Sequence, residues 1–562
     1  MHFYRESLGW HQAGRVGVRL GVASFVRYAH TLRHLRPAQI YGRVWARLWR
    51  PRPALRPASC RRTAMMTWPG PWLRRPSLLG DAQLSLLGDE RTLTSAGDWQ
   101  YVHSTALWLY NLHYFEDLNA AGDGRLGWQR ALIERWIADN PPAVGVGWDP
   151  YPASLRLVNW IRWLLRGNEP LPGMLDSLAI QTRWLQRRIE HHLLGNHLLV
   201  NCKALLFAGT FFTGVEADAW RHEGARLLAR ELDEQILADG GHFERSPMYH
   251  ALIFEDVLDL IALHAVFPGT MDLDAKLRAI ASRMEYWLDS MTHPDGEIAM
   301  FNDSTRGVAA TPLALAGFAR DLGIEPIQRS VGVTELAASG YTRVQRGDAV
   351  LFVDTGEIGP SYTPAHGHAD TLSFELSIEG RRIIVDSGVS EYGTSPERVR
   401  QRGTAAHNTI VVDGADSSEV WSGFRVARRA HVAARSIEER AASVTVRGEH
   451  DGYRRLAGRV THARLWRVED GILVIEDELR GKGWHRADTY YHFAPGIRPQ
   501  PVREFVWALG PQLEIETDPA CKWTIEQGTV HPAMGSVIDA SVLHGQIRAA
   551  LPVRLRTQIR WR

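Results

Sequence analysis

The sequence predicts an α+β protein of two unlike halves, a helical domain followed by an antiparallel β-sandwich. Between about residues 100 and 330, apolar residues recur at helical spacing and no strand pattern intervenes. After about residue 335 the hydrophobic period changes to two, and Gly and Asp turns separate the apolar runs. Helices first and strands second indicate two domains with a ligand site at their interface.

The first 70 residues are expected to form a basic arm and a linker. An apolar stretch at residues 16–26 is too short to cross a bilayer, and it resembles a secretion signal only faintly because no clean cleavage site follows. Residues 31–49 have apolar side chains at helical spacing with arginines between them. They predict a helix that packs on the main body or lies on a membrane surface. A proline-rich stretch then marks the linker, and no later segment is suited to a membrane span.

Residues 71–330 are expected to form the helical domain. Short connections indicate antiparallel neighbours, and so many helices in series predict an α-solenoid or a closed α/α ring. No repeat of fixed period is visible, which weakens the solenoid interpretation. The expected helices lie at approximately 104–120, 125–139, 153–167, 174–192, 197–213, 216–237, 247–266, 273–291 and 311–322.

Residues 331–562 are expected to form the β-sandwich, with strands continuing to the C-terminus and no long helix. The stretch 371–386 predicts a β-hairpin that turns at Glu379-Gly380. A two-residue turn there would set Asp386 opposite Ser373.

Histidines cluster around this hairpin. His366 and His368, separated by one residue, lie on the same side of an extended backbone, and Asp386 and His407 follow. Imidazole and carboxylate groups in β-structure are ligands that zinc prefers, and one histidine would be left free for proton transfer. The alternative is a pair of loop histidines beside an unrelated aspartate at a strand end. Spacing alone does not decide between them.

Two segments of the helical half also carry polar groups. Gly195-Asn196 ends one helix and starts the next, so Asn196 is expected as an N-cap, with His197 beside it where a helix N-terminus favours an anion. Ser246-Pro247 predicts a second helix start, from which Tyr249 and His250 project. Tyr249 could instead pack its ring in the core, but its neighbours are too polar for a core turn.

Six segments in this order resemble the heparinase II/III-like polysaccharide lyases, a family that includes oligoalginate lyases. The resemblance covers about residues 95–500, and the six together are strongly specific although no single one is decisive. It implies an α/α toroid, which is an incomplete barrel, followed by an antiparallel β-sandwich. The segments are Leu107–Phe115, Gly195–His197, Glu244–His250, His366–Asp370, Val385–Gly388 and Ala406–Thr409.

The resemblance implies catalytic roles for four residues. Asn196 and His197 match residues that neutralise a uronate carboxylate, and Tyr249 and His366 match the catalytic tyrosine and histidine. The implied reaction is β-elimination, in which a proton leaves C5 and the bond from C4 to the glycosidic oxygen breaks. An imidazole suits the base and a phenol the acid, unless a shifted pKa lets the tyrosine do both. The assignment depends on syn or anti geometry.

Other roles are implied for the neighbours of these residues. Glu244 and His250 are expected to contact substrate, and His368, Asp386 and His407 match the ligands of a mainly structural zinc ion in those members that bind the metal. The loop that carries His366 and His368 must fold back for this zinc site to close.

The substrate remains open. The expected partner is an acidic polysaccharide rather than nucleic acid, since 65 Lys and Arg against 63 Asp and Glu give a net charge of only +2. Ala251 stands where oligoalginate-type members carry an arginine, which puts alginate in doubt. The resemblance favours a location in the cell envelope or periplasm. The cytoplasm is the alternative, because the sequence shows no clear signal peptide. The sequence does not give an oligomeric state.

Two other functions compete with the lyase. A glycoside hydrolase on an α/α barrel would need two carboxylates across the cleft, for which Asp239, Glu244 and Asp303 are available. A non-catalytic polysaccharide-binding or assembly protein would keep the fold without the chemistry.

Overall fold

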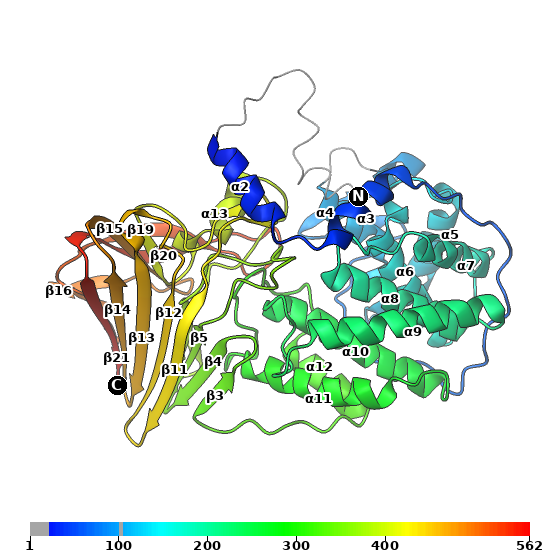
Figure 1. Cartoon of the computed structure of the whole chain (residues 1–562). Coiled ribbons are helices and arrows are strands. Elements are labelled where there is room, and N and C mark those ends of the chain that lie inside the picture. The colour runs from blue at the N-terminus through cyan, green and yellow to red at the C-terminus, as the bar shows by residue number, and fades with distance from the viewer. Residues whose placement is uncertain (1–21, 101–104) are drawn as a thin grey trace.

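The computed structural model describes residues 22–100 and 105–562, so most of the apolar stretch at residues 16–26 lies outside the described part. Figure 1 shows the helical half on one side of the molecule and the sheets on the other. The predicted order, helical domain first and antiparallel β-domain second, is confirmed.

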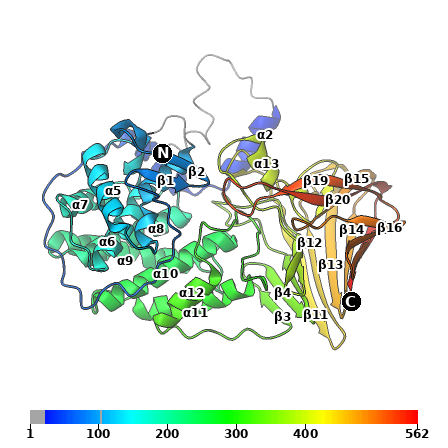
Figure 2. The same ribbon diagram turned by 180° about the vertical axis from the view of Figure 1, so that it is seen from behind.

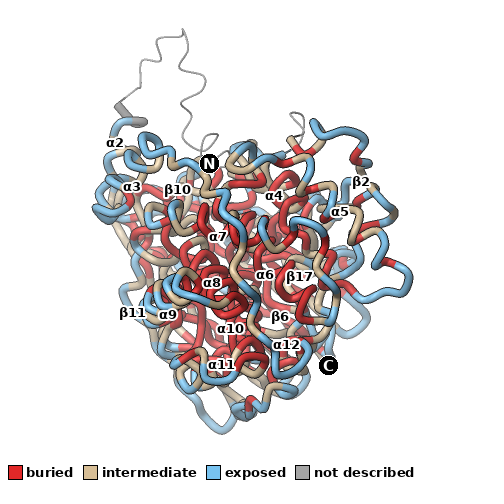
Figure 3. The backbone as a smooth tube through the Cα atoms, turned by 90° about the vertical axis from the view of Figure 1, so that its right-hand side faces the viewer, coloured by how far each residue is buried: buried red, intermediate tan, exposed pale blue. Residues whose placement is uncertain are grey.

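All nine helices expected in the helical domain are present. The first is shorter than predicted because Phe115 adopts a left-handed conformation (φ 60°), which ends α4 and leads into a short 3₁₀ helix, η2. The α8 helix contacts α6, α7, α9 and α10 and is buried along almost its whole length, as Figure 3 shows. The bounds are α4 Ala106–Tyr114, η2 Glu116–Asn119, α5 Leu126–Asp139, α6 Pro150–Leu165, α7 Met174–Gln186, α8 Gly195–Phe211, α9 Val215–Gln235, α10 Pro247–Val266, α11 Asp274–Ser290 and α12 Pro312–Asp321.

From residue 22 onward, the N-terminal arm forms the helices α2 (Val22–Leu32) and α3 (Pro37–Leu48). The proline-rich stretch that was expected as a linker, and the residues that follow it to about residue 78, run in extended form along the helical domain. Their backbone N–H groups bond carbonyls at the ends of three helices: Arg62 to Phe211 of α8 (2.6 Å), Met65 to Val266 of α10 (3.0 Å) and Trp68 to Leu165 of α6 (2.8 Å). These bonds satisfy carbonyls that a helix C-terminus leaves without partners.

Short elements complete the helical half. The β1–β2 hairpin packs beside α4, and Figure 2 shows it on the rear face of the molecule. The bounds are β1 Gln83–Leu86, β2 Asp89–Thr92, η1 Ala96–Gln100 and η3 Val146–Trp148. No helix in the described ranges is long and apolar enough to cross a membrane.

The β-domain contains three large antiparallel sheets, with strand orders β3-β4-β5-β6-β7, β19-β20-β15-β8 and β11-β12-β13-β14-β21-β18-β17-β16. Leu376, Trp466, Tyr491 and Leu543, which come from all three sheets, share one hydrophobic core, as a layered sandwich requires. The bounds are β3 Val333–Leu336, β4 Tyr341–Arg346, β5 Ala349–Asp354, β6 Phe374–Ile378, β7 Arg381–Ile384, β8 Ile410–Val412, β9 Val420–Trp421, β10 Arg425–Val426, β11 Val432–Arg440, β12 Ser443–His450, β13 Thr461–Glu469, β14 Ile472–Arg480, β15 Trp484–His492, β16 Gln500–Arg503, β17 Val506–Gly510, β18 Leu513–Glu516, β19 Lys522–Val530, β20 Ile538–Ala550 and β21 Val553–Trp561, with α13 Pro396–Arg402, η4 Thr404–Ala406 and η5 Ala457–Arg459.

The predicted hairpin turns at Glu379-Gly380, and both residues have the positive φ (50° and 76°) that a two-residue hairpin turn requires. Its register differs from the prediction. A bulge pairs Leu376 with Ile384, whereas an unbroken ladder would pair it with Ile383. The expected position of Asp386 opposite Ser373 is therefore wrong, because the extra residue shifts the far end of β7.

Candidate active site

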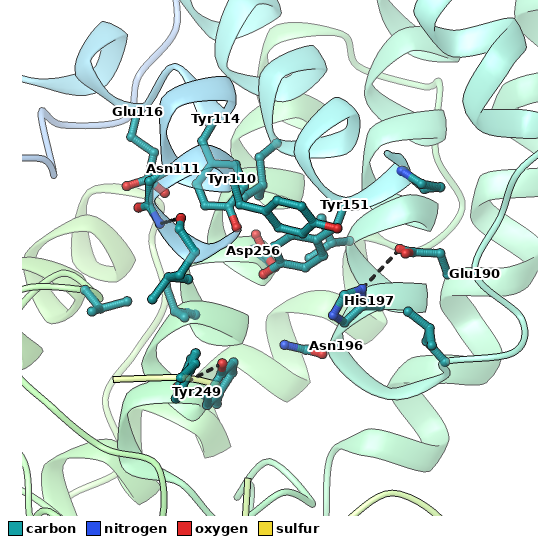
Figure 4. Close-up of a pocket in the computed structure, with 18 of the residues that line it drawn as sticks. Tyr110, Asn111, Tyr114, Glu116, Tyr151, Glu190, Asn196, His197, Tyr249 and Asp256 are labelled. Atoms are coloured by element: carbon teal, nitrogen blue, oxygen red, sulfur yellow. Dashed lines mark hydrogen bonds and ion pairs between the residues drawn. The ribbon is translucent and has the colours of Figure 1, made fainter. Parts of the chain in front are cut away.

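A cavity of about 640 Å³ lies between the two domains. Its walls include Asn196, His197, Glu244 and Tyr249 from the helical domain and His366 from the β-domain. Figure 4 shows Asn196, His197 and Tyr249 around this space. Five of the residues singled out in the sequence are thus brought together, although they are up to 170 positions apart.

Tyr249 and His366 are in direct contact. Their ring centroids are 3.9 Å apart with an interplanar angle of 31°. Ser246 caps α10 by accepting a hydrogen bond from the Tyr249 backbone N–H (3.1 Å), as predicted, and this fixes the tyrosine in the first turn. The Tyr249 hydroxyl lies 3.2 Å from that of Tyr392. Burial, with smaller contributions from Tyr392, raises the pKa of Tyr249 well above its ordinary value, so the phenol stays protonated.

Asp303 orients the His366 ring. Its Oδ2 is 2.8 Å from His366 Nδ1, its Oδ1 is 2.8 Å from His368 Nε2, and Arg398 binds both carboxylate oxygens. Although burial opposes ionisation, Arg398 and the two histidine hydrogen bonds hold the pKa of Asp303 well below its usual range. An ionised carboxylate accepts the proton of Nδ1, which leaves the lone pair of His366 on Nε2.

Asn196 and His197 lie in the first turn of α8, where they were expected. The N-cap, however, is Leu194, with φ 62° and ψ −160°, so the expectation of Asn196 as the capping residue is wrong. The Asn196 side chain makes no hydrogen bond within the described chain and lines the cavity. His197 Nδ1 is 3.2 Å from Glu190 Oε2, and its ring lies 4.4 Å from that of Tyr151. The side-chain amide of Asn196 is therefore available to a ligand at a helix N-terminus.

Glu244 lies beside His366. It is only 3% exposed, its Oε2 is 4.0 Å from His366 Nε2, and this oxygen has no hydrogen-bond partner. Burial raises the pKa of Glu244, against the opposing effect of His366. Glu244 lines the cavity, and its contact to substrate stays a prediction.

His250 lies elsewhere. Its ring is fully buried against Trp287, with ring centroids 4.3 Å apart, and it is not part of the cavity wall. Its Nε2 bonds the Met284 carbonyl (2.9 Å) and its Nδ1 accepts from the His242 backbone N–H (3.2 Å). With both nitrogens satisfied by backbone groups, His250 supports the fold, which corrects the expectation of a substrate contact.

The three expected zinc ligands are neighbours. His407 Nδ1 is 2.6 Å from Asp386 Oδ2, and the rings of His368 and His407 are 5.3 Å apart, so the loop folds back as the zinc expectation requires. His368 Nδ1 and His407 Nε2 are both buried without a hydrogen-bond partner, as ligand atoms would be. Asp386, in contrast, is directed at His407. Within residues 22–100 and 105–562, no set of three His, Cys, Asp or Glu side chains is arranged to hold a metal ion.

Several cavity residues were not singled out as site residues. The outer wall includes Trp45 and Trp49 of the N-terminal arm, although the sequence had given the arm no part in the site. The α4 helix and its surroundings contribute further aromatic, amide and acidic groups. They are Tyr110, Asn111, Tyr114, Glu116, Tyr151 and Asp256.

Two family models match the chain. The model described as "Heparinase II/III N-terminus" matches residues 165–315, and "Heparinase II/III-like, C-terminal" matches residues 329–556. A heparin-sulfate lyase from Bacteroides thetaiotaomicron is 27% identical over 340 residues, which cover 50% of this chain and 47% of that protein. The FtsZ-localized protein C from Caulobacter vibrioides is 27% identical over 381 residues, covering 63% of this chain and 61% of that protein.

The chain spans about half the length or less of the curated heparin-sulfate lyases that it matches. Among solved structures, a crystal structure of heparinase III superposes with a TM-score of 0.66 at 18% identity, covering 82% of this chain and 78% of that one. This similarity shows that the two proteins share a fold. The two family models, which match parts of both domains, show that the chain belongs to the heparinase II/III family.

Proposed function

We propose that the protein is a lyase that cleaves a uronate-containing polysaccharide by β-elimination. The observation that carries the proposal is the contact between Tyr249 and His366 in a cavity that also holds Asn196. An imidazole, a phenol and a free amide are the groups that this reaction needs around C5, O4 and the carboxylate. The relatives named heparin-sulfate lyases support the same class of reaction.

The first requirement is to make the C5 proton acidic. The carboxylate next to C5 is already an anion and opposes the further negative charge that builds up when the proton leaves. Asn196 and the N-terminus of α8 are placed to receive the carboxylate and to stabilise this charge, as an oxyanion hole does. His197, held by Glu190, lies one residue further along the same turn.

The second requirement is a base and an acid on the reacting atoms. We assign His366 Nε2 as the base, since Asp303 holds the other ring nitrogen. The raised pKa of Tyr249 keeps its phenol neutral and favours the role of acid over that of base. In this scheme Nε2 takes the C5 proton, the C4–O4 bond breaks, O4 takes the phenolic proton and a C4–C5 double bond forms.

The hydrolase alternative has weaker support. Of its three candidate carboxylates only Glu244 lines the cavity. Asp303 is fully buried and forms an ion pair with Arg398. Asp239 accepts hydrogen bonds from the backbone N–H and the hydroxyl of Ser339 (2.7 and 2.8 Å). These three therefore do not form a pair of catalytic carboxylates across one sugar.

A panel of uronate polymers scored by ultraviolet absorbance tests the proposal. We expect at least one polymer to give an absorbing product, because β-elimination leaves a double bond conjugated to the carboxylate. Reducing ends that appear without absorbance would indicate the hydrolase. Binding without any cleavage would indicate the non-catalytic alternative. The relative named FtsZ-localized protein C is one reason to test it, because that name refers to a location and not to an enzymatic activity.

The proposal also covers substrate and location. We favour an acidic exopolysaccharide or capsule polymer in the cell envelope. Alginate has less support because of Ala251, and sulfated polymers usually call for dense cationic surfaces that a net charge of +2 does not indicate. The polymer panel should therefore contain both sulfated and unsulfated members.

We propose a structural zinc ion bound by His368 Nδ1 and His407 Nε2, the two unpartnered nitrogens, with Asp386 beside them. Bound zinc would hold the loop that carries His366 and would supply no step of the reaction. Because a metal that binds only the folded state adds to stability, verified removal by a chelator is expected to lower the melting temperature. Elemental analysis of the purified protein and melting before and after chelation measure this. An unchanged melting temperature would count against the zinc site.

A further inference from the structure

The N-terminal arm presents an apolar surface to solvent. Most large apolar side chains of α2 and α3 that could have been buried are instead exposed, for example Leu48 at 76% and Trp45 at 61%. We call this surface the arm face, and its members are Phe25, Leu32, Ile40, Tyr41, Val44, Trp45, Leu48 and Trp49. On α3, Ile40, Val44 and Leu48 follow one another at helical spacing, and an exposed apolar stripe of this kind marks an interaction site.

The orientation of α3 is fixed by its other side. Gln39 is buried and donates a hydrogen bond to the Tyr362 carbonyl (3.1 Å), and Arg188 donates one to the Trp49 carbonyl (3.1 Å). Gly42 packs so closely on His192 that an added Cβ would lie 2.7 Å from the His192 Cβ. The helix is therefore attached to the protein by polar groups and a glycine, while its apolar stripe points outward, the reverse of an ordinary surface helix.

The arm is also strongly basic. Residues 22–52 contain no acidic residue and the following arginines: Arg27, Arg33, Arg36, Arg43, Arg47, Arg50 and Arg52. Arg36 pairs with Glu234 of α9, whereas Arg27, Arg47 and Arg50 have no ion-pair partner in the described chain. The exposed apolar stripe is thus bordered by arginines that pair with no carboxylate of residues 22–100 and 105–562.

We propose that the arm face binds the surface of an anionic lipid bilayer. Helices with Trp, Phe and Leu on one face and arginines on the other lie in the membrane interface, with the apolar side in the acyl boundary and the cations at lipid phosphates. The aliphatic Ile40, Val44 and Leu48 argue against a sugar as the occupant, because sugars stack on flat aromatic rings. A second copy of this chain would bring the same positive charges together.

The surface adjoins the catalytic cavity. Trp45 and Trp49, stacked with ring centroids 5.4 Å apart, belong both to the arm face and to the cavity wall. A bound bilayer would therefore lie at the rim of the cavity and bring it close to polymer held at the membrane. This consequence rests on the proposed lyase function, whereas the lipid contact itself does not.

Co-sedimentation of the full chain with lipid vesicles, without polysaccharide, tests the contact. We expect binding to vesicles of phosphatidylcholine with phosphatidylglycerol, and much weaker binding to phosphatidylcholine alone. The triple variant Val44→Ser/Trp45→Ser/Leu48→Ser should bind at least about tenfold more weakly because it loses the apolar anchor. Its matched control, Trp484→Ser/Val502→Ser/Ile525→Ser, changes three exposed apolar side chains of the β-domain and should bind like the wild type.

A charge-reversal pair tests the role of the arginines. Arg47→Glu/Arg50→Glu should weaken binding to anionic vesicles by about tenfold or more, an effect that added salt reduces. Arg498→Glu/Arg548→Glu makes the same change of net charge at exposed positions of the β-domain and should have little effect. Wild-type protein that binds neither vesicle, or a triple variant that binds unchanged, would overturn the proposal. Loss of a dimer in that variant without vesicle binding would assign the surface to a second copy.

Discussion

Replacement of Tyr249 by phenylalanine is expected to lower kcat on a cleaved uronate polymer by about 10²–10⁴-fold. The change removes one hydroxyl, and with it the proton that O4 must receive as the C4–O4 bond breaks. The ring contact with His366 and the Ser246 cap remain, so the melting temperature should change little. Initial rates from product absorbance, with melting curves of both proteins, measure the two effects.

Tyr114→Phe is the matched control. Tyr114 also lines the cavity, and its ring contacts Tyr110 and Tyr151, away from His366. Its loss of a hydroxyl should affect KM more than kcat. If Tyr249→Phe retains kcat within about threefold, Tyr249 is not the proton donor and the proposed mechanism fails.

Asp303→Asn is expected to damage both catalysis and stability. The amide cannot hold the His366 ring as a carboxylate does, and loss of the orienting charge should lower kcat by about 10²–10⁴-fold. It also leaves the fully buried Arg398 without its counter-charge, which costs about 3–5 kcal/mol of unfolding free energy. Because the pKa of Asp303 is lowered, the carboxylate stabilises the fold above its unfolded-state pKa. That stability is lost as pH falls toward the folded-state pKa.

Asp477→Asn separates the two effects. Asp477 is likewise bound by a buried arginine, Arg464 (2.6 and 3.0 Å), and a histidine, His462 (2.6 Å), but it lies in β14, outside the cavity wall. It should lose comparable stability and keep kcat at temperatures where the protein is folded. Equal losses of kcat in both variants would reduce the role of Asp303 to stability alone.

The features that the sequence predicted correctly are local ones. Serine followed by proline marks the start of α10, and the Glu379-Gly380 dipeptide specifies its hairpin turn, whatever the rest of the chain does. The order of the helical and β halves was likewise predicted from a local property, the spacing of apolar residues along the chain. The prediction that Tyr249 and His366 act together came from the family resemblance, since no local sequence pattern links residues so far apart.

The misses have physical causes. The α10 helix is buried almost all round, so its apolar pattern does not show which side faces the cavity, and His250 lies about 100° around the helix from Tyr249. Asn196 lost its capping role because Leu194 adopts a conformation that leucine rarely takes. Asp303 lies in an irregular loop and finds its partners only through tertiary contacts.

The loop between α11 and α12 supplies Asp303, while His366, His368 and Arg398, which it binds, all come from the β-domain. One carboxylate thus both joins the two halves, alongside contacts such as that of His293 with Glu375, and orients the proposed base. Docking of the domains and assembly of the base are the same event. A conformer in which the two domains have separated would lose both the contact between the domains and the oriented base, so it would be inactive.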